Sequence, residues 1–527
     1  MMAFWSILAN FDLTYPSWKF FALFLPVLAV LWQLSPAKWR RMLLLAADMV
    51  FFWSFSGILV VFLLYSSLLS FGIGLWLKKV GQRTDLKRKI KGKLKKKILI
   101  AGILLLLMPL IGLKYMDFIG LNLVRLSHLF HVGFDWKILN LAVPVGISYF
   151  TLEGISYLTD VYRESIEAED DFLSIFLFFS FFPKLLEGPI TRYGELSETL
   201  NVAKPISGEN LAKGYQRILW GLFKKLVIAD HLAPAVDILF QGNVLDGSLS
   251  LAAGVFFVFQ QYMDFSGSID IVIGAAGIFG VKLNENFRQP FFAKNVSDFW
   301  RRWHITLGTW LKDYVFYPVS VSKGLMKLTK RVKQLFGQNV SRLLAPSAAL
   351  FCVWLCNGLW HGPRWTYIAY GLYHFSWIFL ENLFGDAFSR FYKFIKLSES
   401  SLALRIFRGI KLFLIVMVGE MIFRADSLSF GLTLIWQIFT NFHWKVLIDG
   451  LGLLGMDVWD YWTAAAGLII VLIVSILKER GYPIREKLMA CPVPVRFAFW
   501  YAAIFIVIVF GAYGSGYDAA GMIYAKF

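Results

Sequence analysis

Three histidines in apolar, aromatic sequence are the residues best suited to proton transfer. The chain has seven histidines, and His304, His361 and His374 are the three with such neighbours. The imidazole of histidine titrates near neutrality, so it can take up or give off a proton at physiological pH. An ionisable side chain in apolar surroundings is costly and is usually tied to function or to a specific partner. These three residues are therefore candidates for catalysis, with a hydrogen bond between packed helices as the alternative.

The other four histidines lie in sequence that gives no such indication. His128, His131 and His443 fall in connecting segments, which favours positions at a surface or an interface. His231 lies at the end of a predicted amphipathic helix that begins near Lys213. The C-terminal end of a helix attracts positive charge, so capping explains a histidine at that position.

The three cysteines, Cys352, Cys356 and Cys491, are too few for a disulfide framework. Cys352 and Cys356 are four residues apart and would share one face of a helix. A metal site requires three or four ligands and supporting hydrogen bonds, which the neighbouring sequence does not supply. We therefore interpret both residues as small packing residues between helices, and no metal is implied.

The sequence around His361 predicts a helix end at a functional position. His361 follows Trp360 and precedes Gly362 and Pro363. Proline cannot continue a helix, so the helix should end beside the imidazole. Non-helical backbone at membrane depth is tolerated where it is buried in protein or lines a cavity, which favours a cavity here.

His304 lies in the longest non-apolar stretch, residues 282–345, which also offers two neighbouring arginines and Asp313. Aromatic and basic residues alternate in the first part of this stretch, and it ends in a basic tract at 323–333. Such a segment is expected to lie along the cytoplasmic interface or to re-enter the membrane inside the protein.

The composition indicates that these residues are positioned by membrane helices. The 527 residues are 58% hydrophobic, with a mean hydropathy of +0.61, whereas soluble chains are roughly 45–50% apolar. Apolar runs near the roughly 20 residues that a bilayer requires recur from end to end. The first of them lacks the features of a secretory signal and is expected to be retained as a span. The candidate spans are 18–34, 42–56, 57–77, 98–113, 139–159, 172–188, 214–232, 249–280, 346–360, 365–382, 405–424, 461–477 and 496–513.

These segments predict an all-α polytopic membrane protein with about 11 to 13 transmembrane or re-entrant helices, where 249–280 counts as one or two. Neither a fixed-period repeat nor a soluble domain is evident, so we expect one integral membrane domain over 1–527.

The net charge of +18 is explained by membrane topology, so nucleic acid is not an expected partner. Lysine and arginine collect in the cytoplasmic loops of membrane proteins. Residues 78–97 hold eleven basic residues and one acid between two apolar segments, as a cytoplasmic loop beside anionic lipid would. Counting charges from residue 38 onward places this loop and the tract at 323–333 inside, and the N-terminus outside.

Seven short motifs identify the family that the chain resembles. They lie at 144–150, 157–163, 187–189, 262–267, 284–287, 299–304 and 358–362. Together they resemble the membrane-bound O-acyltransferase superfamily, in the branch of bacterial alginate O-acetylation and teichoic-acid D-alanylation membrane proteins. The resemblance extends over about residues 140–425.

The resemblance implies which residues carry the chemistry. The family has a histidine in a Trp-His-Gly context and an upstream histidine or asparagine, and these positions are His361 and His304. It also implies a tunnel that donor and acceptor enter from opposite faces. We predict that Asn286, Trp303 and Asp313 line or brace this tunnel, with Asp313 as the orienting carboxylate.

Trp360 and Asp264 complete the predicted tunnel residues. After the motif at 262–267 the family usually continues Tyr-Ser-Asp, whereas this chain has Ser268, Ile269 and Asp270. The aspartate is kept, but an aromatic side chain is missing from the acceptor path that the resemblance implies.

Acyl transfer from a thioester to an alcohol requires a base and stabilisation of the oxyanion. We assign His361 as the base, because burial favours the neutral imidazole. A covalent acyl-histidine is the less favoured alternative. His304, or a donor beside it, would polarise the thioester carbonyl or hold the acceptor.

The expected partners follow from this chemistry. No cofactor is expected to be bound; the co-substrate is an acyl thioester, either acetyl-coenzyme A or an acyl carrier protein. The arginines beside His304 and the tract at 323–333 would attract its phosphates or acidic carrier, although positive-inside topology alone explains the same charges. Membrane lipid and a second, extracytoplasmic acyltransferase or acceptor protein complete the expected partners.

Three functions compete. The first is transfer of an acyl group, which we expect to be acetyl, to a cell-surface polysaccharide. The second is D-alanyl transfer to teichoic acids, and the third is transport with histidines that bind protons or substrate. The ordered motifs argue against a transporter. Residues 365–374 resemble the D-alanylation branch, whereas 150–163 and 299–317 resemble the acetylation branch, which we favour. A multi-pass protein of the cytoplasmic membrane is expected.

Overall fold

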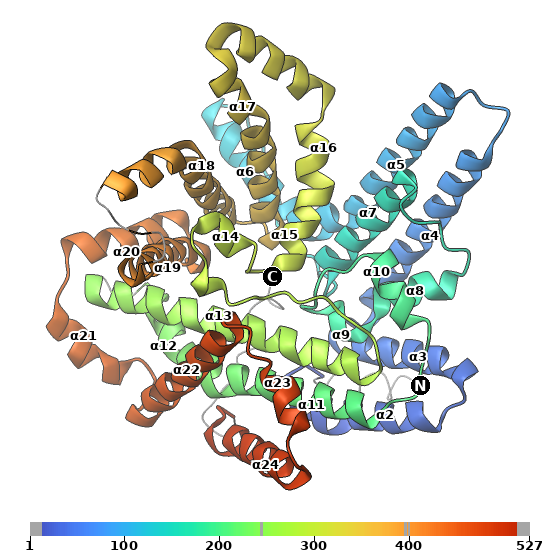
Figure 1. Ribbon diagram of the computed structural model, residues 1–527. Coiled ribbons are helices and arrows are strands. Elements are labelled where there is room, and N and C mark those ends of the chain that lie inside the picture. Colours follow the sequence, from blue (N-terminus) through green and yellow to red (C-terminus); the bar gives the residue numbers. More distant parts are fainter. Residues whose placement is uncertain (1–12, 243–245, 395–397, 399–400, 514–527) are drawn as a thin grey trace. The chain divides into compact units, whose positions relative to one another are not determined.

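The protein is described by a computed structural model that covers residues 13–242, 246–394, 398 and 401–513. Every regular element within these ranges is a helix, as Figure 1 shows. The chain divides into two compact units. Of the described residues, one unit contains 13–218 and 268–284, and the other contains 219–242, 246–267, 285–394, 398 and 401–513. The predicted all-α fold class is confirmed.

The first unit holds the N-terminal helices, which pack mainly as α4, α5 and α7 together with α8. Its elements are η1 (Lys19–Phe24), α2 (Leu25–Leu34), α3 (Ala37–Ser56), η2 (Gly57–Leu59), α4 (Val60–Gln82), α5 (Arg88–Leu110), η3 (Ile111–Tyr115), α6 (Met116–Leu129), α7 (Ile147–Arg163), α8 (Phe172–Ser180), α9 (Phe182–Leu185) and α10 (Tyr193–Leu200). Two helices, α11 (Gly208–Leu222) and α13 (Gly247–Ile278), contribute residues to both units.

The second unit holds the C-terminal helices, among which α17, α18 and α19 pack in series. Its elements are η4 (Phe223–Ala229), α12 (Asp230–Leu239), η5 (Pro290–Phe292), α14 (Val296–Trp300), α15 (Ile305–Leu311), η6 (Lys312–Phe316), α16 (Tyr317–Ser320), α17 (Lys323–His361), α18 (Trp365–Phe394), α19 (Leu402–Arg424), α20 (Leu428–Thr440), α21 (Trp444–Gly450), η7 (Leu451–Leu453), α22 (Val458–Glu479), α23 (Ile484–Ala490) and α24 (Val493–Phe510).

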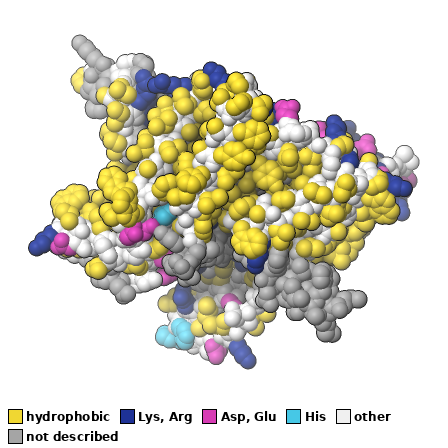
Figure 2. Space-filling model, turned by 90° about the horizontal axis from the view of Figure 1, so that it is seen from below, with side chains coloured by type: hydrophobic (Ala, Val, Ile, Leu, Met, Phe, Trp, Pro, Cys, Tyr) yellow, Lys and Arg dark blue, Asp and Glu magenta, His cyan; other side chains and the backbone are white. Residues whose placement is uncertain are grey.

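Five helical stretches of the described chain are long and apolar enough to cross a membrane: Ala37–Gln82, Arg88–Leu129, Ser341–His361, Val458–Glu479 and Val493–Phe510. Many of their apolar side chains face outward, and on α24 Phe497, Tyr501 and Phe505 are each at least half exposed. Hydrophobic side chains cover most of the face seen in Figure 2. Exposed apolar surface of this extent marks contact with lipid, so the chain is a multi-pass membrane protein.

The structure resolves two of the predicted spans further. The segment 249–280, which we counted as one or two helices, is one continuous helix, α13, over Gly247–Ile278. The segment 172–188 is not one span, because α8 ends at Ser180 and the four-residue α9 follows. Pro183 has no backbone N–H to continue the ladder, and the N–H of Phe182 instead donates to Asp48 at 2.8 Å.

The basic segment 78–97 is mostly helical, which corrects the predicted loop. Helix α4 continues to Gln82 and α5 begins at Arg88, so only a short turn joins them. The Lys95 ammonium donates a 2.7 Å hydrogen bond to Glu164 and holds the pKa of that carboxyl below its usual range. The prediction missed the helices because basic side chains are good helix formers once apolar packing has begun the helix. The orientation across the membrane stays a prediction.

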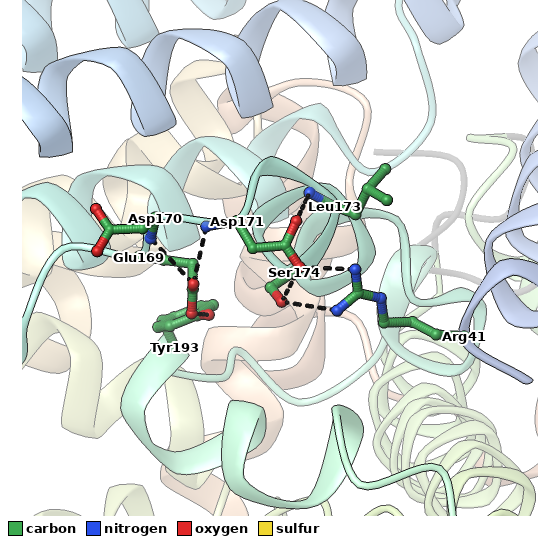
Figure 3. A network of polar contacts seen from close by, with 7 residues as sticks. All are labelled: Arg41, Glu169, Asp170, Asp171, Leu173, Ser174 and Tyr193. Carbon is green, nitrogen blue, oxygen red and sulfur yellow. Dashed lines mark hydrogen bonds and ion pairs between the residues drawn. The ribbon is translucent and has the colours of Figure 1, made fainter. Parts of the chain in front are cut away.

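The segment before α8 is held by the polar network drawn in Figure 3. Asp171 caps α8 by accepting from Leu173 N–H at 2.9 Å, and Arg41 of α3 pairs with the same carboxylate at 2.6 Å. Glu169 accepts from the Tyr193 hydroxyl at 2.5 Å. These contacts fix α8 and α10 within the first unit.

His231 is not at a helix end, which corrects the capping interpretation. The chain from Gly208 to Leu239 is helical throughout, because the π-helix η4 joins α11 to α12. The buried His231 ring lies 2.8 Å from Asp460 through Nδ1 and 2.9 Å from the Phe510 carbonyl through Nε2. It therefore fastens α12 to α22 and to the end of α24.

Candidate active site

His361 lies at the last position of α17, and α18 begins at Trp365. The predicted helix end beside the imidazole is therefore confirmed. The two helices approach closely there, since a Cβ on Gly358 would lie 2.5 Å from the Tyr367 carbonyl oxygen. The absence of a side chain at Gly358 lets α18 pack directly beside the histidine.

Aromatic rings surround the His361 imidazole, which is only 5% exposed. Its centroid lies 5.0 Å from that of Phe423 and 6.0 Å from that of Tyr370, both at nearly right angles. The neighbouring Trp360 ring lies at 4.9 Å and Tyr367 at 6.1 Å. The ring is held by the edges and faces of aromatic side chains from α17, α18 and α19.

His304 has a different environment, with a polar group directly on the ring. It is 4% exposed, and its Nδ1 lies 3.3 Å from Oδ1 of Asn286, whose side chain is fully buried. The same oxygen accepts from the Thr306 backbone N–H at 3.0 Å and from the Thr306 hydroxyl at 2.9 Å. Because an oxygen held in this way acts as an acceptor, the arrangement assigns the proton to Nδ1 and leaves Nε2 as the basic nitrogen.

The backbone at His304 is strained. Its φ is 46° and its ψ is 52°, a left-handed conformation immediately before α15. For a residue other than glycine this costs roughly 1–2 kcal/mol, and such strain clusters at functional sites. Backbone hydrogen bonds from Ile305 N–H to Asn286 at 3.0 Å and from Arg288 N–H to Arg302 at 2.9 Å hold the conformation.

The indole of Trp360 lies against both histidines. The His304 centroid is 5.4 Å from that of Trp360, which also contacts its neighbour His361. The structure thus brings both imidazoles, 57 residues apart in sequence, to one indole. That they share a tunnel stays a prediction.

Among the other predicted residues, Trp303 is an aromatic brace. It is 3% exposed and packs against Phe299 at 5.5 Å, Phe287 at 5.1 Å and Tyr262 at 5.6 Å. Asp313 lies on η6, and its role as the orienting carboxylate stays a prediction. Asn286 contacts the His304 ring directly through its Oδ1.

Asp264 lies in a buried ion pair. Its carboxylate is 2.5 Å from the Lys225 ammonium, which also pairs with Asp230 at 2.7 Å. All three side chains are nearly inaccessible. A buried lysine must be compensated by opposite charge, so this contact is sufficient to explain Asp264. Its tunnel role stays a prediction.

Asp270 is the aspartate that this chain keeps where the sequence after 262–267 differs from the family, and it also has a defined partner. It accepts a 2.8 Å hydrogen bond from the Arg217 guanidinium within the first unit. Arg302, which we expected to attract substrate phosphates, pairs with Asp298 at 3.3 Å and with Glu479 at 3.0 Å. Much of its charge is therefore already compensated.

Sequence reasoning missed a polar cluster next to His361. Glu420 of α19 is 1% exposed and accepts from the Tyr370 hydroxyl at 3.2 Å. His374, the third candidate histidine, is fully buried one helical turn from Tyr370, with ring centroids 4.7 Å apart. The signal was available, because Glu420 is an acid inside the apolar segment 405–424 and such residues are usually functional.

Comparison with known proteins identifies the family. The family model for membrane-bound O-acyltransferases matches residues 145–419. A probable alginate O-acetylase of Azotobacter vinelandii is 31% identical over 437 residues, which cover 81% of this chain and 78% of that protein.

The names of two further relatives specify other substrates. A peptidoglycan O-acetyltransferase of Helicobacter pylori is 34% identical over 53% of this chain and 54% of its own length. A teichoic acid D-alanyltransferase of Bacillus subtilis is 29% identical over 49% of this chain and 63% of its own length. Because the family model matches more than half of the chain, this protein belongs to the membrane-bound O-acyltransferase family and is an acyltransferase.

Proposed function

We propose that this enzyme moves an acetyl group from a cytoplasmic thioester to a hydroxyl of a cell-surface polysaccharide. The observation that carries the proposal is the pair of buried imidazoles, His304 and His361, against the Trp360 indole. Two histidines in water-poor surroundings suit a reaction in which one imidazole takes up a proton and the other holds the acceptor.

In the proposed reaction, His361 accepts the proton of the acceptor hydroxyl as its oxygen attacks the thioester carbonyl. The new C–O bond forms, the oxyanion collapses and the C–S bond breaks. The proton then passes from the imidazolium to the departing thiolate, so the reaction needs no other co-reactant. The Asn286 contact keeps the His304 proton on Nδ1, so His304 holds the acceptor by accepting a hydrogen bond at Nε2 from one of its hydroxyls. A donor beside His304 polarises the thioester carbonyl.

The proposed donor is acetyl-coenzyme A or an acyl carrier protein. The enzyme is proposed to lie in the inner membrane, where this donor reaches it from the cytoplasm. The segment of α17 that holds Lys323, Lys327 and Lys330 supplies positive charge for phosphates or for an acidic carrier. A second protein outside the membrane is proposed to receive the acyl group or complete its transfer.

Acetyl transfer is supported by the relatives whose names specify it. The alginate O-acetylases match 81% of this chain, whereas the D-alanyltransferase of Bacillus subtilis matches 49%. D-alanyl transfer remains the second candidate because residues 365–374 resemble that branch.

The proposal is tested in inverted membrane vesicles that contain the overproduced protein. Radiolabelled acetyl-coenzyme A and a radiolabelled D-alanyl carrier protein are supplied separately, and label in the polymer fraction is measured. Acetyl label that depends on the enzyme supports the proposal. Label from the D-alanyl carrier alone would replace it by the second candidate, and label from neither donor would contradict both.

A further inference from the structure

The buried cluster of Tyr370, Glu420 and His374 lies beside His361 but has no part in the reaction as described above. Glu420 and Tyr370 are 1% and 2% exposed, and His374 is fully buried. A carboxyl group in such a place is costly unless its hydrogen bonds are made and its position serves a purpose. Its partners therefore indicate what it does.

Glu420 fixes the position of the Tyr370 ring. Its Oε1 accepts from the Tyr370 hydroxyl at 3.2 Å, which joins α19 to α18. Gln261 of α13 hydrogen-bonds to the same carboxyl and so limits its rotation. A side chain tied at its hydroxyl end cannot change rotamer without breaking this bond.

His374 fixes the same ring from another side. The two centroids are 4.7 Å apart at 80°, and His374 is itself enclosed by Trp300 at 4.8 Å and Trp354 at 5.6 Å. A Cβ on Gly419 would lie 2.5 Å from His374 Nε2. The glycine before Glu420 thus lets the imidazole lie directly against the α19 backbone.

Tyr370 in turn forms part of the wall against which His361 rests. The Tyr370 centroid lies 6.0 Å from that of His361 and 5.1 Å from that of Phe423. Phe423 follows Glu420 by three residues on α19 and contacts His361 at 5.0 Å. One helix therefore supplies both the acceptor for Tyr370 and a second ring against the imidazole.

We propose that Glu420 is a positioning residue for acyl transfer, which acts through its hydrogen bond with Tyr370 to hold His361 in its reactive orientation. The inference rests on the proposed role of His361 as the base. This positioning role requires the Glu420 side chain to accept a hydrogen bond from Tyr370, and it does not require a negative charge on Glu420. The alternative is that the hydrogen bond between Tyr370 and Glu420 only holds α18 against α19 and has no effect on catalysis.

The test compares four variants in purified, lipid-reconstituted protein, with acetyl transfer and thermal unfolding measured for each. Tyr370→Phe removes the donor and keeps the ring, and Glu420→Leu removes the acceptor. Glu420→Gln keeps an acceptor oxygen without charge. Tyr373→Phe is the matched control, because the Tyr373 hydroxyl also donates a hydrogen bond to α19. Its acceptor is the Ile415 carbonyl oxygen, at 2.9 Å.

Misplacement of a reacting group by a fraction of an ångström to 1 Å costs up to about 100-fold in rate. We expect Tyr370→Phe and Glu420→Leu to lower kcat about 10- to 100-fold with KM within about threefold of wild type. Glu420→Gln should restore kcat to within about threefold, and Tyr373→Phe should be near wild type. The double variant Tyr370→Phe/Glu420→Leu should be no slower than the slower single variant.

Two outcomes overturn the proposal. Wild-type kcat in Tyr370→Phe would show that the hydrogen bond does not serve catalysis. An equal loss in Tyr373→Phe, together with lowered thermal stability, would show a purely structural bond between the helices. His361→Ala is assayed in parallel, and its full activity would reject the proposed base while leaving the result for Tyr370 readable on its own.

Discussion

Two sets of buried polar side chains, one in each unit of the chain, have different physical roles. In the first unit Glu153 and Lys184 form a buried ion pair at 2.5 Å, and Thr191 donates to the same glutamate at 3.1 Å. In the second unit the motif residues His304 and His361 lie among aromatic rings, and the polar partner seen on His304 is neutral Asn286.

This difference teaches how to interpret a buried polar side chain. A buried opposite-charge pair that is fully hydrogen-bonded specifies packing, because removing either charge leaves the other uncompensated. A neutral imidazole among aromatic rings contributes little to packing and keeps a nitrogen for chemistry. Gly146 belongs to the packing group, since its φ is 78° and a Cβ would lie 2.4 Å from the Leu185 carbonyl oxygen.

The largest effect should come from the second unit. His304→Ala removes the ring that holds the acceptor and should lower acyl transfer by about 100-fold or more, because misplacement of a reacting group by about 1 Å costs that much. Thermal unfolding in detergent should stay close to wild type, which purified protein would show. Retention of more than about a tenth of the activity would place His304 outside the reaction.

In the first unit the corresponding change should act on stability. Lys184→Met leaves Glu153 buried and uncompensated, which costs about 3–5 kcal/mol. We expect low yield and a lowered unfolding temperature, with turnover per folded molecule near wild type.

The matched control is the double variant Glu153→Gln/Lys184→Met, which removes both charges and should recover most of the stability. If Lys184→Met were stable but inactive, Lys184 would belong to the reaction and the contrast between the two units would fail.

A smaller loss of activity is expected from a change at Asn286, whose side chain contributes both to the position of His304 and to stability. Asn286→Ala removes the acceptor that holds His304 Nδ1–H and should lower kcat about 10- to 100-fold by releasing the ring. Because Oδ1 also accepts from Thr306, a loss of about 1–3 kcal/mol in stability should accompany it. Steady-state kinetics measures the loss of kcat, and calorimetry measures the loss of stability. Unchanged kcat would contradict the orienting role.

The smallest effect should follow from His374→Leu. Neither ring nitrogen of His374 has a hydrogen-bond partner within the described residues, so the imidazole loses hydration without compensation. An apolar side chain of similar size should leave stability within about 1 kcal/mol of wild type or raise it, as calorimetry would measure. A loss above about 3 kcal/mol would show that the His374 imidazole makes a stabilising hydrogen bond and would contradict this prediction.

The sequence predicted those features that follow from short-range physical rules. Apolar runs of membrane length predicted the helical membrane fold, and Gly362-Pro363 predicted the end of α17 at His361. The motif match predicted the two histidines and the family. These features depend on a few neighbouring residues, so one sequence is enough to find them.

Features that depend on partners distant in sequence were not predicted. The acceptor for His304 is Asn286, 18 residues earlier in the chain, and nothing in the spacing favours it over Asp313. The bonds from His231 to Asp460 and Phe510 join residues more than 200 positions apart. The extension of α4 and α5 into the basic segment depends on helix packing, which charge patterns do not indicate.

The central claim is that His361 acts in chemistry and not in folding, and the most direct measurement is the turnover of purified His361→Ala. We expect wild-type abundance and thermal stability in detergent, with acyl transfer lowered at least about 100-fold. A folded variant that keeps more than roughly a few per cent of wild-type turnover would contradict the claim, because loss of a base costs about 100-fold or more.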